Sequence, residues 1–208
     1  MKLLPLVLML PAIAHAWQFE VGAGVTKYQT VDSRWYQQSQ PHQLGVTPAA
    51  WSLGVTGDLT EHVAWHVGYA DLGRATASCD CLTRDEDYAA RRSGPHALFS
   101  GQGATQGFVL SLEPHTDVSG WRVGAEAGVY LGHTHWSETV TGWTVNDQPR
   151  QNLSLSSSYW QAAPVVGASV GRDNWAVRYR HYFTSVGANR NVPPAFRDAD
   201  VIEYVLKF

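Results

Sequence analysis

Hydrophobic residues alternate with small or polar residues along most of the chain. In the first such segment every second residue from Trp17 to Val25 is hydrophobic, and the residues between them include Glu20 and three other small or polar residues. A period of two is typical of a β-strand with one apolar face, and no segment has an amphipathic helical period of similar quality. The alternation recurs at 51–56, 63–69, 107–112, 121–131, 160–171, 175–180 and 201–208. The pattern therefore predicts eight strands.

The connections between these segments alternate between short and long. The short ones are Asp58–His62, Glu113–Gly120 and Arg172–Asn174, and the long ones are 29–49, 73–102, 132–152 and 184–199. Short periplasmic turns and long outer loops are typical of bacterial outer-membrane barrels, and an even strand number places both chain ends in the periplasm. The fold class predicted is all-β, an eight-stranded antiparallel up-and-down transmembrane β-barrel.

The N-terminus has the features of a secretion signal. Lys2 precedes an apolar run from Leu3 to Ala14, and Ala14-His15-Ala16 matches a small-x-small cleavage site. The run is too short to span a bilayer as a helix. We therefore expect residues 1–16 to be a cleaved signal peptide and residues 17–208 to form the barrel in the outer membrane of a Gram-negative cell. An uncleaved N-terminal anchor is the alternative.

Composition separates the barrel from a soluble β-sandwich, the main alternative architecture. The 208 residues include nine Trp and nine Tyr, rings that favour membrane–water interfaces. Aromatic residues begin or end the predicted strands, with Trp17, Trp121, Trp175 and Phe208 at the expected periplasmic end and Trp51, Tyr69 and Trp160 at the outer end. Two such girdles favour a barrel, and the net charge of −3 indicates no nucleic-acid partner.

The last segment carries a resemblance to a known superfamily. Ile202, Tyr204, Leu206 and the terminal Phe208 alternate with Glu203 and Lys207. With the signal and the strand rhythm, this ending resembles the small eight-stranded outer-membrane proteins, the OmpA transmembrane domain and the OmpX and Ail-like proteins. The resemblance implies that these four hydrophobic residues are read by the outer-membrane assembly machinery. It also implies a monomer surrounded by outer-membrane lipids and lipopolysaccharide.

The polar face of the predicted strands carries charges that would lie inside the barrel. We expect an ion-pair network of Glu20, Arg122, Glu126, Arg178, Arg180, Glu203 and Lys207, with Gln18, His66, Tyr130, Gln161 and Tyr182 on the same side. An eight-stranded barrel is only wide enough for its side chains to fill it, and buried charges need partners. The expected lumen is therefore filled, and a narrow channel is the alternative.

A second group of residues lies where the fifth predicted strand ends. His135 and Ser137 are two residues apart and share one face of an extended chain, and Glu138 follows them. A hydroxyl beside a His base with a carboxylate near is the minimum for hydrolysis. The pair is similar to the His-x-Ser pair of barrel lipid A deacylases, although that family places it within a lipid-facing strand. Lipid A or phospholipid hydrolysis is therefore an alternative function.

The long loops hold further candidate sites. Cys79 and Cys81 are expected to form a local disulfide in an oxidising envelope, with a bridge to another chain or metal ligation as alternatives. Cations at Arg34, Arg91, Arg92 and Arg190 are candidates for contacts with lipopolysaccharide phosphates or an extracellular ligand. We expect no metal and no cofactor. The main prediction is a non-enzymatic surface, structural or adhesion-type protein that acts through its loops.

Overall fold

The structure is a computed structural model that describes residues 17–31, 39–82, 96–142, 144–145, 148–149, 151–187 and 194–208. Within these ranges, no helix is long and apolar enough to cross a bilayer. The strands are β1 (Gln18–Thr30), β2 (Ser39–Gly45), β3 (Ala49–Thr60), β4 (Val63–Leu82), β5 (His96–Val118), β6 (Trp121–Thr141), β7 (Thr144–Val145), β8 (Gln148–Pro149), β9 (Leu153–Arg172), β10 (Trp175–Val186) and β11 (Phe196–Lys207).

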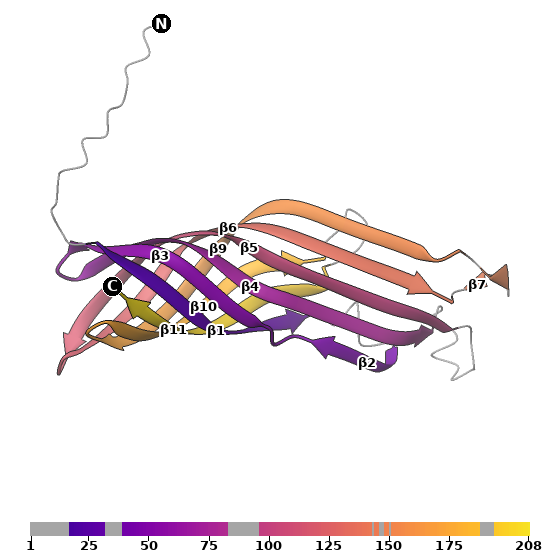
Figure 1. The fold of residues 1–208 in the computed structure, drawn as a ribbon, viewed down its shortest axis with the longest axis horizontal. Coiled ribbons are helices and arrows are strands. Elements are labelled where there is room, and N and C mark those ends of the chain that lie inside the picture. Colours follow the sequence, from indigo (N-terminus) through magenta and orange to yellow (C-terminus); the bar gives the residue numbers. More distant parts are fainter. Residues whose placement is uncertain are drawn as a thin grey trace, which may run out of the picture.

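Eight of these strands close into an antiparallel ring, as predicted from the alternation. The order around the ring is β1, β3, β4, β5, β6, β9, β10 and β11. The ring closes between β1 and β11, from Glu20 opposite Lys207 to Thr30 opposite Phe196. The start of β1 and the end of β11 lie at the same end of the barrel (Figure 1). There Phe19 and Phe208 exchange backbone hydrogen bonds of 2.9 and 3.2 Å.

The outside of the barrel is apolar, and its inside is polar at one end. Phe19, Leu110 and Ile202 are more than half exposed although they are large hydrophobic residues. Their sequence neighbours on the other face, such as Glu20, Ser111 and Glu203, are at most 4% exposed. This is the reverse of a soluble protein, in which large exposed apolar surfaces are rare.

The exposed aromatic rings form two groups. At the end with the short turns, the ring of Trp175 lies 5.5 Å from that of Trp121 and 5.8 Å from that of Tyr204. Toward the other end, the ring of Tyr69 lies 5.8 Å from Trp51 and 5.5 Å from Phe108. Both groups face outward, because most of these rings are on the exposed face of their strands.

The turns between β3 and β4, β5 and β6, and β9 and β10 are two residues long. The turn between β5 and β6 is Ser119-Gly120, with φ of 53° and 80°, which is the two-residue geometry that matches strand twist. The predicted connection Glu113–Gly120 is therefore wrong, because β5 continues to Val118. Polar residues at 113–118 resemble a turn in the sequence, but alternate residues among them face the inside.

Four strands continue far beyond the rim of the barrel and form an outer sheet. β4, β5, β6 and β9 have 20 to 23 residues, whereas β1, β10 and β11 have 12 or 13. β2 pairs with the distal part of β4, from Gly45 opposite Thr76 to Ser39 opposite Cys81. Figure 1 shows β4, β5, β6 and β9 extending past β1 and β11.

The outer sheet corrects the predicted loops 29–49, 73–102 and 132–152. β4 and β5 stay paired as far as Leu82 opposite His96, and β6 and β9 as far as Val140 opposite Leu153. Most outward positions here are polar, such as Thr76, Gln102 and His135, although Leu98 is an exposed apolar residue. The apolar alternation that identifies a membrane strand is therefore largely lost while the backbone pairing continues. A register shift in β4 between Asp71 and Arg74, with Gly73 at a φ of 76°, interrupts the alternation further.

Close backbone approach at the β1–β11 seam generates a first prediction. A Cβ at Gly24 would clash with the backbone oxygen of Ile202, so Gly24→Ala must separate the two closing strands. We expect a loss of about 1–3 kcal/mol of folding free energy, measured by urea unfolding in lipid vesicles. Ala23→Val, on the outward face of the same strand, is the control. Equal stability of Gly24→Ala and the control would contradict tight packing of the seam.

Candidate functional site

The inside of the barrel near the short turns contains a cluster of charged side chains. Arg178 on β10 lies between Glu20 on β1 and Glu203 on β11. Its Nη1 donates to Glu20 Oε2 at 3.0 Å, and its Nε and Nη2 donate to Glu203 Oε2 at 3.3 and 3.2 Å. All three side chains are at most 4% exposed. The guanidinium therefore joins the two strands that close the ring and the strand beside them.

A second buried ion pair lies one inward position further along β10. Arg180 Nε donates to both carboxylate oxygens of Glu126 at 3.0 and 2.9 Å, and its Nη2 donates to Oε1 at 2.6 Å. Ser111 Oγ also donates to this carboxylate. Such multiple contacts fix the geometry of an arginine–carboxylate pair. Arg180 thus links β10 to β6 and, through Ser111, to β5.

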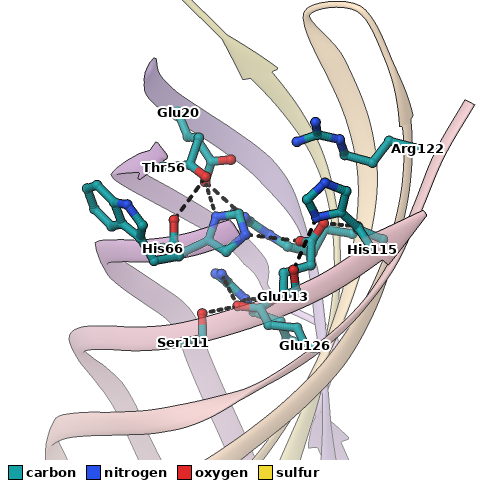
Figure 2. A network of polar contacts seen from close by, with 12 residues as sticks. Glu20, Thr56, His66, Ser111, Glu113, His115, Arg122 and Glu126 are labelled. Atoms are coloured by element: carbon teal, nitrogen blue, oxygen red, sulfur yellow. Dashed lines mark hydrogen bonds and ion pairs between the residues drawn. The ribbon is translucent and has the colours of Figure 1, made fainter. Parts of the chain in front are cut away.

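His66 bridges two carboxylates in the same cluster (Figure 2). Its Nδ1 lies 3.3 Å from Glu20 Oε2, and its Nε2 lies 3.0 Å from Glu113 Oε2. Ser169 Oγ donates to the other oxygen of Glu113 at 3.0 Å. A histidine between two acceptors can donate to both when it is an imidazolium. Its charge would then complete the balance of four carboxylates, two guanidiniums and Lys207.

The structure brings together six of the seven residues of the ion-pair network predicted from the sequence. Glu20, Glu126, Arg178, Arg180 and Glu203 lie together, and Lys207 Nζ is 3.6 Å from Glu20 Oε1.

Arg122 does not belong to this cluster. Its Nη1 contacts Asp58 at 3.2 Å and its Nε contacts Asp117 at 3.9 Å, at the rim near the turns, where the arginine side chain is 35% exposed. The alternation of polar and apolar residues correctly predicts that Arg122 is on the inner face of its strand, but it does not predict how deep in the barrel the residue lies.

Glu113 belongs to this cluster although the sequence predicts it in a short connection between strands. Glu113 is 3% exposed and contacts His66. Glu113 is two residues after Ser111, and the alternation at 107–112 places Ser111 on the inner face. Extending the period by one more residue would have found it.

Aromatic side chains occupy the barrel interior on the other side of the charged cluster. The rings of Tyr130 and Tyr182 lie 5.0 Å apart, and Phe196 lies 5.8 Å from Trp136 and 6.0 Å from Tyr28. Each of these five residues is at most 2% exposed. They belong to one buried hydrophobic cluster together with Leu72, Val109 and Val186. The interior thus has a charged layer near the turns and an aromatic layer toward the outer sheet.

An open space lies inside the barrel at the end with the turns. A vestibule of about 640 Å³ is lined there by residues that include Asp58, Asp117, Arg122 and Lys207. The space beside Glu20, His66, Arg178 and Arg180 is about 10 Å³, which is no more than one water needs. The charged layer is therefore densely packed around Glu20, His66 and Arg178.

The predicted hydrolytic residues are not brought together. His135 and Ser137 share the outward face of β6, but Glu138 lies on the inward face, 8% exposed, and its Oε2 accepts a hydrogen bond from Trp136 Nε1 at 2.7 Å. A neighbouring histidine, His133, has its Nε2 2.9 Å from Ser158 Oγ on β9. The carboxylate of Glu138 is thus separated from His135 and Ser137 by the sheet itself.

Other predicted loop residues fall outside what the structure describes. Arg34, Arg91, Arg92 and Arg190 lie outside the described residues. The backbone of Cys79 and Cys81 belongs to β4, but their side chains are not described, so the disulfide stays a prediction. Within the described ranges, no three His, Cys, Asp or Glu side chains lie close enough together to hold a metal ion.

The buried pair of Arg180 and Glu126 generates a second prediction. Arg180→Met leaves the Glu126 carboxylate buried without its cation, and breaking a buried pair in this way costs about 3–5 kcal/mol. We expect urea unfolding, followed by tryptophan fluorescence, to show a loss of this size. Adding Glu126→Gln should recover much of it.

Arg122→Met is the matched control, because partly exposed ion pairs contribute at most about 1 kcal/mol and the Arg122 side chain is 35% exposed. An equal loss in Arg122→Met and Arg180→Met would contradict the special role of the interior pair.

Comparison with known proteins gives likenesses of fold. No protein-family model matches the chain, and no curated protein is significantly similar to it. Ail, the attachment invasion locus protein of Yersinia pestis, solved in complex with the heparin analogue sucrose octasulfate, has 10% identity and a TM-score of 0.46, covering 92% of this chain and 99% of Ail. The outer membrane protein OprG from Pseudomonas aeruginosa has 9% identity and a TM-score of 0.47, covering 93% of this chain and 97% of OprG.

Proposed function

We propose that the chain is a non-enzymatic outer-membrane barrel with a filled lumen that presents its outer sheet and loops at the cell surface. Residues 1–16 would direct its export and be removed, and outward Ile202, Tyr204, Leu206 and Phe208 would be read by the assembly machinery. The single observation that carries the proposal is the reversed distribution of polarity, with large apolar side chains outside and paired charges inside.

The apolar exterior supports a membrane location. A closed barrel pairs every strand on both edges, so its backbone groups are satisfied without water, as a bilayer requires. Exposed Phe19, Leu110, Val129 and Ile202 would contact acyl chains, and exposed rings such as Trp121 and Trp160 would lie toward the two interfaces. In water the same surface would be a strong driving force for aggregation.

Two interior layers support a filled lumen rather than a channel. Ions crossing the barrel would have to pass both the ion pairs of Arg178 and Arg180 and the buried rings of Tyr130, Tyr182 and Phe196. Opening such a path would separate buried charges from their partners.

Conductance in planar bilayers tests the lumen directly. The purified full chain should insert and give no steady conductance above the background of the bilayer at neutral pH, because both layers block the path. A matched sample of a known porin verifies that the assay detects open barrels. A stable, reproducible conductance step from the chain would establish the narrow-channel alternative and reject the filled lumen.

The outer sheet supports a surface-binding role. β4, β5, β6 and β9 carry their pairing well past the rim of the ring, so a rigid surface rather than loose loops projects from the barrel. A groove of about 600 Å³ lies on it, lined mostly by small or polar residues such as Thr76, Ser100 and Gln102, together with the carboxylate residue Glu138. The hydroxyl and amide groups offer hydrogen bonds to a polar extracellular ligand.

A charge-substitution experiment tests this role. The triple variant Thr76→Glu, Gln102→Glu and Ser137→Glu should reduce the adherence of expressing cells to immobilised extracellular-matrix proteins at least tenfold. A ligand that covers the groove would bury the three carboxylates and strip them of their hydrating water, which costs free energy. The control places three glutamates at Thr60, Thr116 and Asn174, near the short turns. Adherence that is absent in the wild type, or equal in both variants, would contradict binding through this surface.

A further inference from the structure

Two cysteines lie on one face of β4 in the outer sheet. β4 pairs along its length with β5 and, in its distal part, with β2 on the other side. Cys79 and Cys81 are two residues apart in this strand. Successive residues of a strand alternate between its two faces, so both cysteines belong to the same face of β4.

The extended backbone separates the two cysteines by more than a disulfide spans. Residues two apart in a strand are about 6.6 Å apart, whereas a disulfide brings its two Cβ atoms to about 3.5–4.5 Å. The pairing of β4 with β5 runs from Ser78 opposite Ser100 to Leu82 opposite His96 without a register shift. A local disulfide between the cysteines would therefore require β4 to leave this pairing.

Cross-strand register brings a histidine to the same place. His42 on β2 is directly opposite Cys79 on β4, at one end of a run of pairs that continues to Gly45 opposite Thr76. Residues directly opposite each other in an antiparallel pair share a face, with Cβ atoms about 4.5–5.5 Å apart. Spacing along the sequence gives no sign of this histidine, because only the pairing of β2 with β4 places it beside the cysteines.

The face that carries these three residues is the inward face of the outer sheet. The next pair on it is Leu44 opposite Ala77, of which Ala77 is 2% exposed and Leu44 packs against the buried hydrophobic cluster. Phe99, opposite Cys79 on β5, packs against the same cluster. Apolar neighbours limit the access of solvent to a metal site and strengthen the bonds of charged ligands to the ion.

Two thiols and one imidazole form a ligand set that zinc accepts. Zn²⁺ binds Cys sulfur at about 2.3 Å and His nitrogen at about 2.0–2.1 Å, with tetrahedral geometry. Two sulfurs on one such ion are nearly twice as far apart as two bonded sulfurs, so a shared ion suits the wider spacing of an extended strand. Asp80, between the cysteines in the sequence, belongs to the other face and is not in this set.

We propose that His42, Cys79 and Cys81 bind a zinc ion between β2 and β4, with water as the fourth ligand. The two thiols lose their protons to solvent when the zinc–sulfur bonds form, and no oxidant is needed. Within the part of the chain that the structure describes, β2 pairs with β4 alone (Figure 1). The ion would therefore fasten the edge strand to the outer sheet. This inference goes beyond the proposed surface role and rests on the pairing of β2 with β4.

Cobalt spectroscopy of the full chain, folded in nanodiscs with a phosphine reductant, tests the proposal. One equivalent of Co²⁺ should give thiolate-to-cobalt charge-transfer absorption, and Zn²⁺ should remove it by displacement. Cys79→Ser, Cys81→Ser and His42→Gln should each weaken Zn²⁺ binding at least tenfold, because each variant loses one ligand. Absence of the absorption in the wild type, or equal binding in the wild type and His42→Gln, would overturn the site.

His96→Gln is the matched control. His96 is opposite Leu82, which lies on the other face of β4 from the cysteines, so this variant should bind Zn²⁺ as the wild type does. Heat-dependent mobility in electrophoresis verifies that every variant is a folded barrel. A loss in His96→Gln as large as that in His42→Gln would contradict a site on the inward face.

Thiol alkylation of the wild-type chain gives a readout that needs no variant. Zn²⁺ should slow the reaction of both cysteines with iodoacetamide at least tenfold, and a chelator should restore the rate. Mass spectrometry of protein isolated from cells without reductant reports the state of the thiols. A disulfide between Cys79 and Cys81, or between two copies of the chain, would overturn the proposal.

Hydrogen exchange tests the position of the ion between the two strands. The backbone N–H groups from His42 to Gly45 should exchange with solvent at least tenfold more slowly in the presence of Zn²⁺, because the ion ties β2 to β4. Unchanged exchange in a zinc-bound chain would contradict this position. A chain that binds no zinc but adheres through its outward face would reject the metal site and leave the proposed surface role intact.

Discussion

The contact on which the structure depends is the buried ion pairing of Arg178. Its guanidinium, on β10, contacts Glu20 on β1 and Glu203 on β11, so a single side chain spans both strands of the seam that closes the ring. A barrel without this closure would leave two strand edges with unsatisfied backbone groups. The second pair, Arg180 with Glu126, connects the same strand to β6, two strands away around the ring.

This pairing explains why the interior is organised in layers. Charges can be buried only in a region dense with partners. Near the end with the short turns, the interior holds four buried carboxylates together with their cations: Glu20, Glu113, Glu126 and Glu203. Toward the outer sheet the interior partners are aromatic, with Tyr28 donating its hydroxyl to the backbone oxygen of Gly73 at 3.0 Å. The aromatic layer also supports the outer sheet, because Trp136 of β6 packs against Phe196 of β11.

The parts of this arrangement that the sequence predicts are those with a strict period. Alternation identifies the eight ring strands and the inward faces of Glu20, Arg178 and Glu203. Alternation does not give the depth of a residue along the barrel, and it therefore groups Arg122 with side chains that Arg122 does not reach.

Two other features could not be read from the sequence, for different physical reasons. The outer sheet is mostly polar on its outward face. β4 therefore continues to Leu82, and β5 begins at His96, without the regular apolar alternation of a membrane strand. Asp200 accepts hydrogen bonds from Gln29 and Tyr179 and contacts His181. This cluster depends on cross-strand register, which joins residues as distant in sequence as Gln29 and Asp200. Register is set by pairing across the seam, and no local pattern encodes it.

The central claim is that the charged layer is packed and shielded from water, and the exchange of the guanidinium protons tests it most directly. In nanodiscs, the Nε protons of Arg178 and Arg180, which donate to Glu203 and Glu126, should exchange with solvent at least a hundredfold more slowly than that of the exposed Arg172. Exchange of all three at the rate of a free arginine would show a hydrated lumen and contradict the account.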